Sequence, residues 1–191
     1  QGEREMLFSG KEREENRKLD NLIAAAAAGN HADFETLYRM TSASVYGFAL
    51  SILKNSHEAE EVSQEVYLTV YSKAGRYESQ GKPMAWILTI TRNHCLMRLR
   101  NAKKDESTSP EEMEALLTSS GFGDAKEKGI LLTSAMEKLE DEERQIVILH
   151  AVSGLLHREI AEILELPLPT VLSKYRRSLA KLRKILKEEL G

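Results

Sequence analysis

The sequence predicts an all-α protein in which two small helical domains are joined by an acidic linker, with a helix-turn-helix in the C-terminal domain. Gly and Pro, the residues that interrupt helices most strongly, account for only 11 and 4 of the 191 residues. Ala, Leu, Glu, Lys and Arg are plentiful, and runs of β-branched residues are short. A segment rich in Ser, Thr, Gly and acids separates two stretches of helical periodicity.

The N-terminal domain is expected to cover residues 19–103, after a highly charged extension at 1–18. Its helices are predicted at 19–28, 31–54, 57–74 and 83–103. Gly29-Asn30 and Asn55-Ser56 mark breaks between helices, because Gly and Asn favour helix ends. Pro83 suits the first position of a helix, where the missing backbone donor has no cost.

The C-terminal domain is expected to cover residues 134–191, with helices at 134–152, 157–164 and 169–188. The acidic linker before it occupies 104–133, with a short helix expected at 110–118. Its sequence runs from Ser-Thr-Ser-Pro through a group of acids to Ser-Ser-Gly-Phe-Gly, a composition typical of a linker.

The net charge of −3 hides a strong separation of charge along the chain. Residues 79–104 contain six basic residues and no acidic one, and 166–191 contain seven basic and two acidic residues. Between them, 105–143 contains twelve acidic and three basic residues. Blocks of this kind are typical of contact with a polyanion, although charge alone fits a solvated helix surface equally well.

The last two predicted helices form the helix-turn-helix, with a turn at 165–168. On the long helix, 100° per residue puts one set of side chains on an apolar arc: Val171, Tyr175, Leu179, Leu182 and Leu186. The opposite arc is polar and carries no acid before Glu188, which an ordinary amphipathic surface helix does not explain well. Residues near the N-terminus of such a helix reach base edges in the major groove, and flanking cations hold phosphates. The candidate contacts to duplex DNA are Thr170, Ser173, Lys174, Arg176, Arg177 and Lys181.

The predicted helix 57–74 carries an acidic ridge formed by Glu58, Glu61 and Glu65. An acidic ridge repels phosphate, so we expect its partner to be a basic protein surface. A solvated face explains the same spacing equally well.

The predicted helix 83–103 has the opposite character. An aromatic residue, Trp86, lies in an acid-free segment with Arg92, Arg98 and Arg100. This combination is typical of proteins that stack single-stranded bases and hold their phosphates. A single Trp is more often part of a core, and we interpret Trp86 as mainly structural.

Other function classes have little support in the sequence. The five histidines are scattered without metal-ligand spacing, the adjacent His94 and Cys95 would lie on separate faces of a helix, and there is no Gly-rich phosphate loop. We therefore expect no catalytic residue, no metal and no cofactor. The single cysteine favours a reducing compartment, and neither a secretion signal nor a membrane-spanning stretch is found, so we expect a cytoplasmic protein without membrane insertion.

In this order the segments resemble a bacterial RNA polymerase sigma factor of the sigma-70 family, of the extracytoplasmic-function (ECF) type, over most of 20–188. The run from His57 to Leu68 resembles region 2.2 of the family. The run from Pro83 to Asn93 resembles the segment that melts promoters and recognises the −10 element. Residues 139–183 resemble region 4, whose second helix reads the −35 element.

The resemblance implies partners and site residues. Core RNA polymerase would be bound through its β′ clamp helices and β flap, with the clamp contacts on Glu58, Glu61, Gln64 and Glu65. The −10 contacts would be Trp86, Arg92, Asn93, Arg98 and Arg100, and the −35 contacts would be the duplex candidates given above. Promoter DNA, both duplex and melted, is thus a second partner, and an anti-sigma protein is a candidate antagonist. By the same resemblance, the acidic linker would thread through the polymerase near the RNA exit path.

Two further hypotheses are a stand-alone helix-turn-helix regulator of operators and an enzyme. An operator binder needs neither the acidic ridge nor the segment from Trp86 to Arg100. The chain departs from the family pattern at Met97, where an acid is usual, at Glu165, where the turn usually has Gly, and at Leu172, where a base is frequent. These departures bear on which promoter sequence the chain would prefer, more than on the class of protein.

Overall fold

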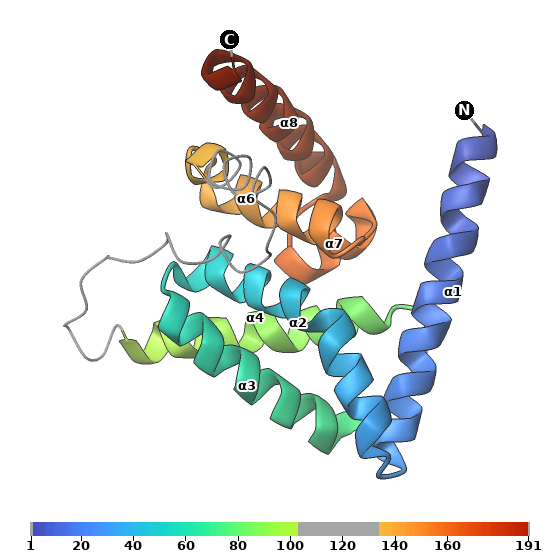
Figure 1. The fold of residues 1–191 in the computed structure, drawn as a ribbon. Coiled ribbons are helices and arrows are strands. Elements are labelled where there is room, and N and C mark those ends of the chain that lie inside the picture. Colours follow the sequence, from blue (N-terminus) through green and yellow to red (C-terminus); the bar gives the residue numbers. More distant parts are fainter. Residues whose placement is uncertain (1, 103–133, 191) are drawn as a thin grey trace.

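The computed structural model describes residues 2–102 and 134–190. The N-terminal domain consists of α1 (Gly2–Ala27), α2 (His31–Leu53), α3 (Ser56–Lys73), the short 3-10 turn η1 (Ala74–Arg76) and α4 (Pro83–Ala102). The C-terminal domain contains α6 (Asp141–Val147), the π-helical turn η2 (Ile148–Val152), α7 (His157–Leu164) and α8 (Leu168–Leu190) (Figure 1). The described residues form helices and no strand, which confirms the all-α class with two helical domains. The expected linker at 104–133, with its helix at 110–118, lies outside the described residues.

Local capping residues set the helix boundaries that the sequence predicts. The Asn30 side-chain oxygen accepts hydrogen bonds from the backbone N–H groups of Ala32 and Asp33 at 3.1 and 3.2 Å, and Asn55 caps α3 in the same way. Gly29 has a φ of +87°, a left-handed conformation that costs least at glycine. Pro83 begins α4, as expected.

The first helix is longer than predicted, since α1 begins at Gly2 instead of near residue 19. Residues 2–18 are rich in Glu, Arg and Lys, which are good helix formers, and contain no proline. Tertiary contacts hold the C-terminal part of α1 against the loop before α4. The Asn16 amide donates to the Gly81 carbonyl at 3.0 Å, and the Asp20 carboxylate accepts from Tyr77 Oη and Ser79 Oγ at 2.7 and 2.6 Å. This helix therefore positions the loop that leads into α4.

The expected continuous helix at 134–152 is wrong. Residues 134–137 are helical, the helix breaks at 138–140, and α6 starts at Asp141. Arg144 is buried, and its guanidinium donates to the backbone carbonyls of Met136, Glu137 and Leu139 at 2.9, 3.1 and 2.9 Å. It thereby satisfies carbonyl groups that the break leaves without helical partners.

The two domains share one hydrophobic core. A contiguous cluster of buried side chains contains Leu37 and Phe48 of α2 and Ile87 of α4 together with Ile146 of α6 and Ile160 of α7. Figure 1 shows α6 and α7 lying against α2 and α4, with α8 pointing away from the N-terminal helices. The C-terminal domain is thus packed on the N-terminal domain.

Candidate functional site

The helix-turn-helix is present, and its turn has an unusual residue. Glu165 ends α7 in the left-handed conformation, with a φ of 57°, where glycine would be unstrained. The Leu166 N–H closes the turn on the Ala161 carbonyl at 3.0 Å. The sequence therefore predicts the turn correctly although its usual glycine is replaced.

The buried arc of α8 is rotated relative to the predicted one. Of the predicted apolar arc, Val171 and Leu182 are buried, whereas Leu179 is 38% exposed. The small Ser178 is fully buried there instead, and its hydroxyl donates to the Lys174 carbonyl at 2.8 Å. Crossing helices approach closely at a small residue, which moves the centre of the buried arc toward Ser178.

Two of the six duplex candidates turn toward α6. Lys174 Nζ lies 3.0 Å from a carboxylate oxygen of Glu142, and Lys181 Nζ lies 3.0 and 2.7 Å from the two oxygens of Glu143. Burial by itself would raise the pKa of Glu143, but the Lys181 ammonium and the Glu140 N–H lower it overall. These lysines therefore support the packing of α8 on α6.

The other four duplex candidates are not held in this way. Ser173, Arg176 and Arg177 are exposed, and Thr170 is half-buried near the start of α8. Arg177 is nonetheless close enough to Glu143 of α6 for its charge to help lower the pKa of that acid. The outward face of α8 is therefore polar and basic.

The acidic ridge of α3 lies against basic residues of α4. Arg98 donates to Glu61 at 2.6 Å and to Glu65 at 2.7 Å, and His94 Nδ1 lies 3.2 Å from Glu65. The hydrogen bond from Arg98, helped by the charges of His57 and Arg98, lowers the pKa of Glu61. The structure thus joins two ridge residues, predicted to bind polymerase, to a residue predicted to bind DNA.

The outward side of α3 also carries Leu68, which is 73% exposed. It lies one helical turn after Gln64, which is exposed as well, whereas Glu58 is half-buried. Leu68 therefore adds an exposed apolar side chain to the polar side of α3 that carries Gln64. Sequence reasoning missed Leu68, although its i, i+4 spacing from Gln64 was a usable signal.

The candidates on α4 divide into covered and outward residues. Trp86 is half-buried with its ring centroid 4.5 Å from that of Tyr77, an arrangement that fits a mainly structural role. The Arg92 side chain is only 19% exposed, and its guanidinium lies 3.2 Å from the Glu165 carboxylate. Asn93 and Arg100 are exposed.

Three ion pairs join the described parts of the two domains. They are Lys54–Asp141 at 2.8 Å, Lys82–Glu162 at 3.5 Å and Arg92–Glu165 at 3.2 Å. In each pair the base belongs to the N-terminal domain and the acid to the C-terminal domain. No local sequence pattern indicated them, since their partners are 73 to 87 residues apart.

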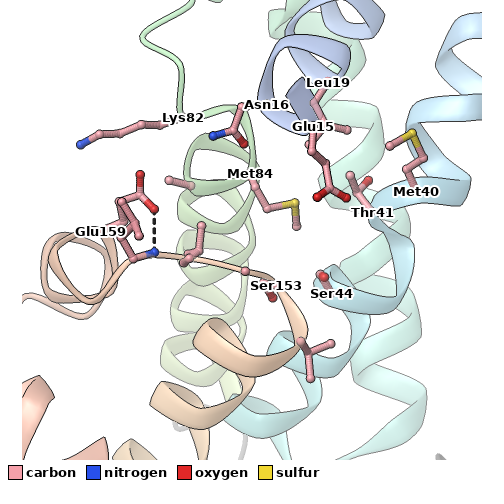
Figure 2. Close-up of a pocket in the computed structure, with 15 residues that line it drawn as sticks. Glu15, Asn16, Leu19, Met40, Thr41, Ser44, Lys82, Met84, Ser153 and Glu159 are labelled. Atoms are coloured by element: carbon pink, nitrogen blue, oxygen red, sulfur yellow. Dashed lines mark hydrogen bonds between the residues drawn. The ribbon is translucent and has the colours of Figure 1, made fainter. Parts of the chain in front are cut away.

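A cavity of about 180 Å³ lies at the same junction. Figure 2 shows its wall, in which Thr41 and Ser44 of α2 and Met84 of α4 face Ser153 and Glu159 of the C-terminal domain. Across the residues that the structure describes, there is no cluster of three or more metal-ligating side chains. Among the same residues, no helix is long and apolar enough to cross a membrane.

Two further features are a pair of stacked histidines in the C-terminal domain and the buried cysteine of α4, Cys95. The rings of His150 and His157 stack with centroids 4.3 Å apart, and both contact Tyr175. Burial, together with the neighbouring His150, lowers the pKa of His157. Burial raises the pKa of the Cys95 thiol to about 12, so this thiol is protonated at neutral pH.

Comparison with known proteins identifies both domains. The family Sigma-70 region 2 matches residues 37–105, and the family Sigma-70, region 4 matches residues 130–182. The ECF RNA polymerase sigma factor SigK of Mycobacterium sp. (strain KMS) is 30% identical over 167 residues, which cover 83% of this chain and 85% of the relative. SigK of Mycobacterium tuberculosis (strain ATCC 25618 / H37Rv) is 28% identical over 174 residues, covering 88% and 93%.

Two solved structures have a similar fold. CnrH, in complex with the cytosolic domain of CnrY, has a TM-score of 0.61 at 20% identity and covers 90% of this chain and 98% of its own. The sigma factor RpoE of Bartonella quintana, in complex with the anti-sigma factor NepR, has a TM-score of 0.64 at 21% identity, with coverages of 81% and 97%.

Proposed function

Because this chain belongs to the ECF group of the sigma-70 family, we propose that it binds core RNA polymerase and directs it to specific promoters for transcription initiation. The observation that carries the proposal is the occurrence of region 2 and region 4, in this order, on the two helical domains of one chain. A stand-alone operator-binding regulator needs only the second of these and is not favoured. We propose that the chain acts in the cytoplasm by binding alone, without catalysing a reaction.

The outward face of α3 is the proposed polymerase contact. Its acidic residues Glu58, Glu61 and Glu65, with Gln64, suit a basic partner surface such as the β′ clamp helices. Leu68 adds a large exposed apolar side chain to this face, and interfaces commonly combine a central apolar anchor with a polar rim. Arg98 holds the carboxylates of Glu61 and Glu65 in place.

Promoter contacts are proposed on α4 and α8. On α4 the −10 candidates are Trp86, Arg92, Asn93, Arg98 and Arg100. On α8 the −35 contacts are proposed on the outward residues Ser173, Arg176 and Arg177, with Thr170 at the start of the helix. Lys174 and Lys181 would contribute positive charge near the backbone of the duplex while paired with α6. An anti-sigma antagonist would have to cover the acidic ridge of α3 or the basic helices α4 and α8.

The decisive experiment is co-purification of the chain with core RNA polymerase, followed by transcription from a library of promoters. We expect a stable complex and initiation at a subset of promoters that core enzyme alone does not use. Absence of a complex with the wild-type chain would overturn the proposal.

A variant on α3 tests the surface. Leu68→Glu should weaken core binding at least tenfold, because it puts a charge at the apolar position of the interface without removing an internal contact. Ala24→Glu, at an exposed site on α1, is the control with the same added charge and should bind as the wild type.

A further inference from the structure

The start of α8 carries two leucines outside the hydrophobic cores. Leu168, the first residue of α8, is 40% exposed, and Leu172 follows one helical turn later and is half-buried. The two buried clusters in the described part of the chain are formed without either side chain. Packing of the core therefore does not account for leucine at these two positions.

Both leucines lie where a helix-turn-helix meets bases. In such a motif the N-terminal residues of the second helix contact base edges in the major groove. Leu168 and Leu172 are about 40° apart around the helix axis, so they share one side of it. Pro167 and Pro169 restrict the backbone on either side of Leu168, and the Thr170 N–H closes the first turn on the Pro167 carbonyl at 2.9 Å. The first leucine is therefore held in a fixed position at the end of the helix.

The polar side chains of the first two turns are already bonded within the chain. Lys174 is the only basic residue in 168–174. Its side chain is 17% exposed, with Nζ 3.0 Å from the Glu142 carboxylate. The Ser173 hydroxyl donates to the Thr170 carbonyl at 3.0 Å. An Arg or Lys that is free to form the usual bidentate contact with guanine is thus missing from these two described turns.

Thymine is the base that an apolar side chain can recognise. In the major groove it carries a C5 methyl group, whereas the other three bases present only hydrogen-bond donors and acceptors there. A leucine side chain has no polar atom to pair with those groups, but it can cover a methyl group and exclude water from it. Burial of one methyl group changes a binding constant by about fourfold. Apolar residues at the start of α8 therefore favour thymine.

We propose that Leu168 and Leu172 are specificity-determining residues that contact the C5 methyl groups of thymines in the −35 element. This inference rests on the proposed function, because it takes α8 as the helix that binds duplex DNA. Arg176 and Arg177 are exposed in the next turn and hold the flanking phosphates, so the arginines supply affinity and the leucines supply base choice. The −35 elements that this chain uses accordingly contain thymine at one or two fixed positions.

Deoxyuridine provides the test, because it pairs with adenine as thymidine does and lacks only the methyl group. The chain bound to core RNA polymerase is given two versions of a promoter that it uses from the library. One version has thymine and the other has deoxyuridine throughout the −35 element, and the melted segment is the same in both. For half-maximal initiation, the wild type should need about fourfold more of the deoxyuridine template for each contacted methyl group.

Alanine variants assign the effect to the two leucines. Leu168→Ala and Leu172→Ala should each use the thymine template less well and should lose part of the difference between the templates. Leu179→Ala is the matched control, since it makes the same change on the same helix at a residue that is 38% exposed and lies about three turns further along. This control should keep the full difference that the wild type shows.

The outcomes separate this inference from the proposed function. Equal use of the two templates by the wild type would overturn the inference, and that comparison does not require any variant to fold. Selected promoters without thymine in the −35 element would overturn it as well. If the templates are used equally and both alanine variants bind core polymerase less tightly, the leucines contact a protein instead. Absence of initiation by the wild type on the thymine template would refute the proposed function itself.

Discussion

Replacing Lys181 should destabilise the C-terminal domain, because this lysine neutralises a buried acid. The Glu143 side chain is only 2% exposed, and its two carboxylate oxygens lie 3.0 and 2.7 Å from Lys181 Nζ. Lys181→Met keeps most of the aliphatic stem and removes the ammonium. The carboxylate would then be left mainly with the Glu140 N–H at 3.3 Å and the nearby charge of Arg177.

The magnitude follows from the burial of the two partners. Removing one partner of a fully buried pair costs roughly 3–5 kcal/mol. The Lys181 side chain is 44% exposed and therefore partly screened by water, so we expect a loss of about 2 kcal/mol. For a protein of this size such a loss lowers Tm by about 4–8 °C. The double variant Glu143→Gln with Lys181→Met should recover about 1 kcal/mol, because it leaves no buried charge.

Urea unfolding followed by far-UV circular dichroism at pH 7.5 measures these values. Lys187→Met, on an exposed position of the same helix, is the control and should change stability by less than about 0.5 kcal/mol. The reasoning is refuted if Lys181→Met and Lys187→Met are equally stable. In that case a loss of duplex binding by Lys181→Met would mark Lys181 as a DNA contact only.

Three further predictions concern other residues. Arg177→Ala should weaken duplex binding and should reduce the slope of log(binding constant) against log(salt concentration) by about one, the value expected for one lost phosphate contact. Fluorescence anisotropy between about 50 and 200 mM salt measures this slope, and an unchanged slope would exclude a phosphate contact. Because the pKa of His157 is lowered by burial and by His150, the neutral ring favours the fold. Stability should therefore be complete above pH 6.5 and decline as pH falls below it, and His157→Phe should flatten this decline in urea titrations at pH 7.5 and 5.5. Native Cys95 should resist a disulfide reagent at pH 8 and react only on unfolding, since its thiol is buried and protonated; rapid reaction in the folded chain would contradict its burial.

Features determined by neighbours in sequence could be predicted, and those determined by distant contacts could not. Asn30, Asn55 and Pro83 end or begin helices through their own side chains and backbones, so the corresponding boundaries agree with prediction. The helix break at 138–140 was not predicted, because it depends on Arg144, whose guanidinium donates hydrogen bonds to three backbone carbonyl groups that precede it in the chain. The interdomain pair Arg92–Glu165 spans 73 residues, and a single sequence contains no signal for it.

The orientation of α8 shows where helical periodicity stops being informative. Val171 and Leu182 are close to the centre of the buried arc, and their burial is predicted correctly. Lys174 and Lys181 lie at the edge of that arc, where an angle of 100° per residue does not decide between solvent and a neighbouring helix. The two lysine side chains turn toward α6 because Glu142 and Glu143 of that helix lie beside them. The residue type does not reveal the partner either, because a basic side chain can pair with a phosphate or with a carboxylate.

The same ambiguity applies to the basic residues of α4. Arg92 and Arg98, both proposed to bind DNA, each lie against a carboxylate of the chain itself, from Glu165 and from Glu61 with Glu65. Under the proposed assignments, a DNA phosphate has to compete with these carboxylates, so the unbound chain has little net attraction for DNA. A basic partner surface bound to α3 would engage Glu61 and Glu65 and would thereby free the guanidinium of Arg98 for a phosphate. Because salt weakens the internal pairs and the DNA contacts together, the −10 contact should depend on salt less steeply than its count of basic residues suggests.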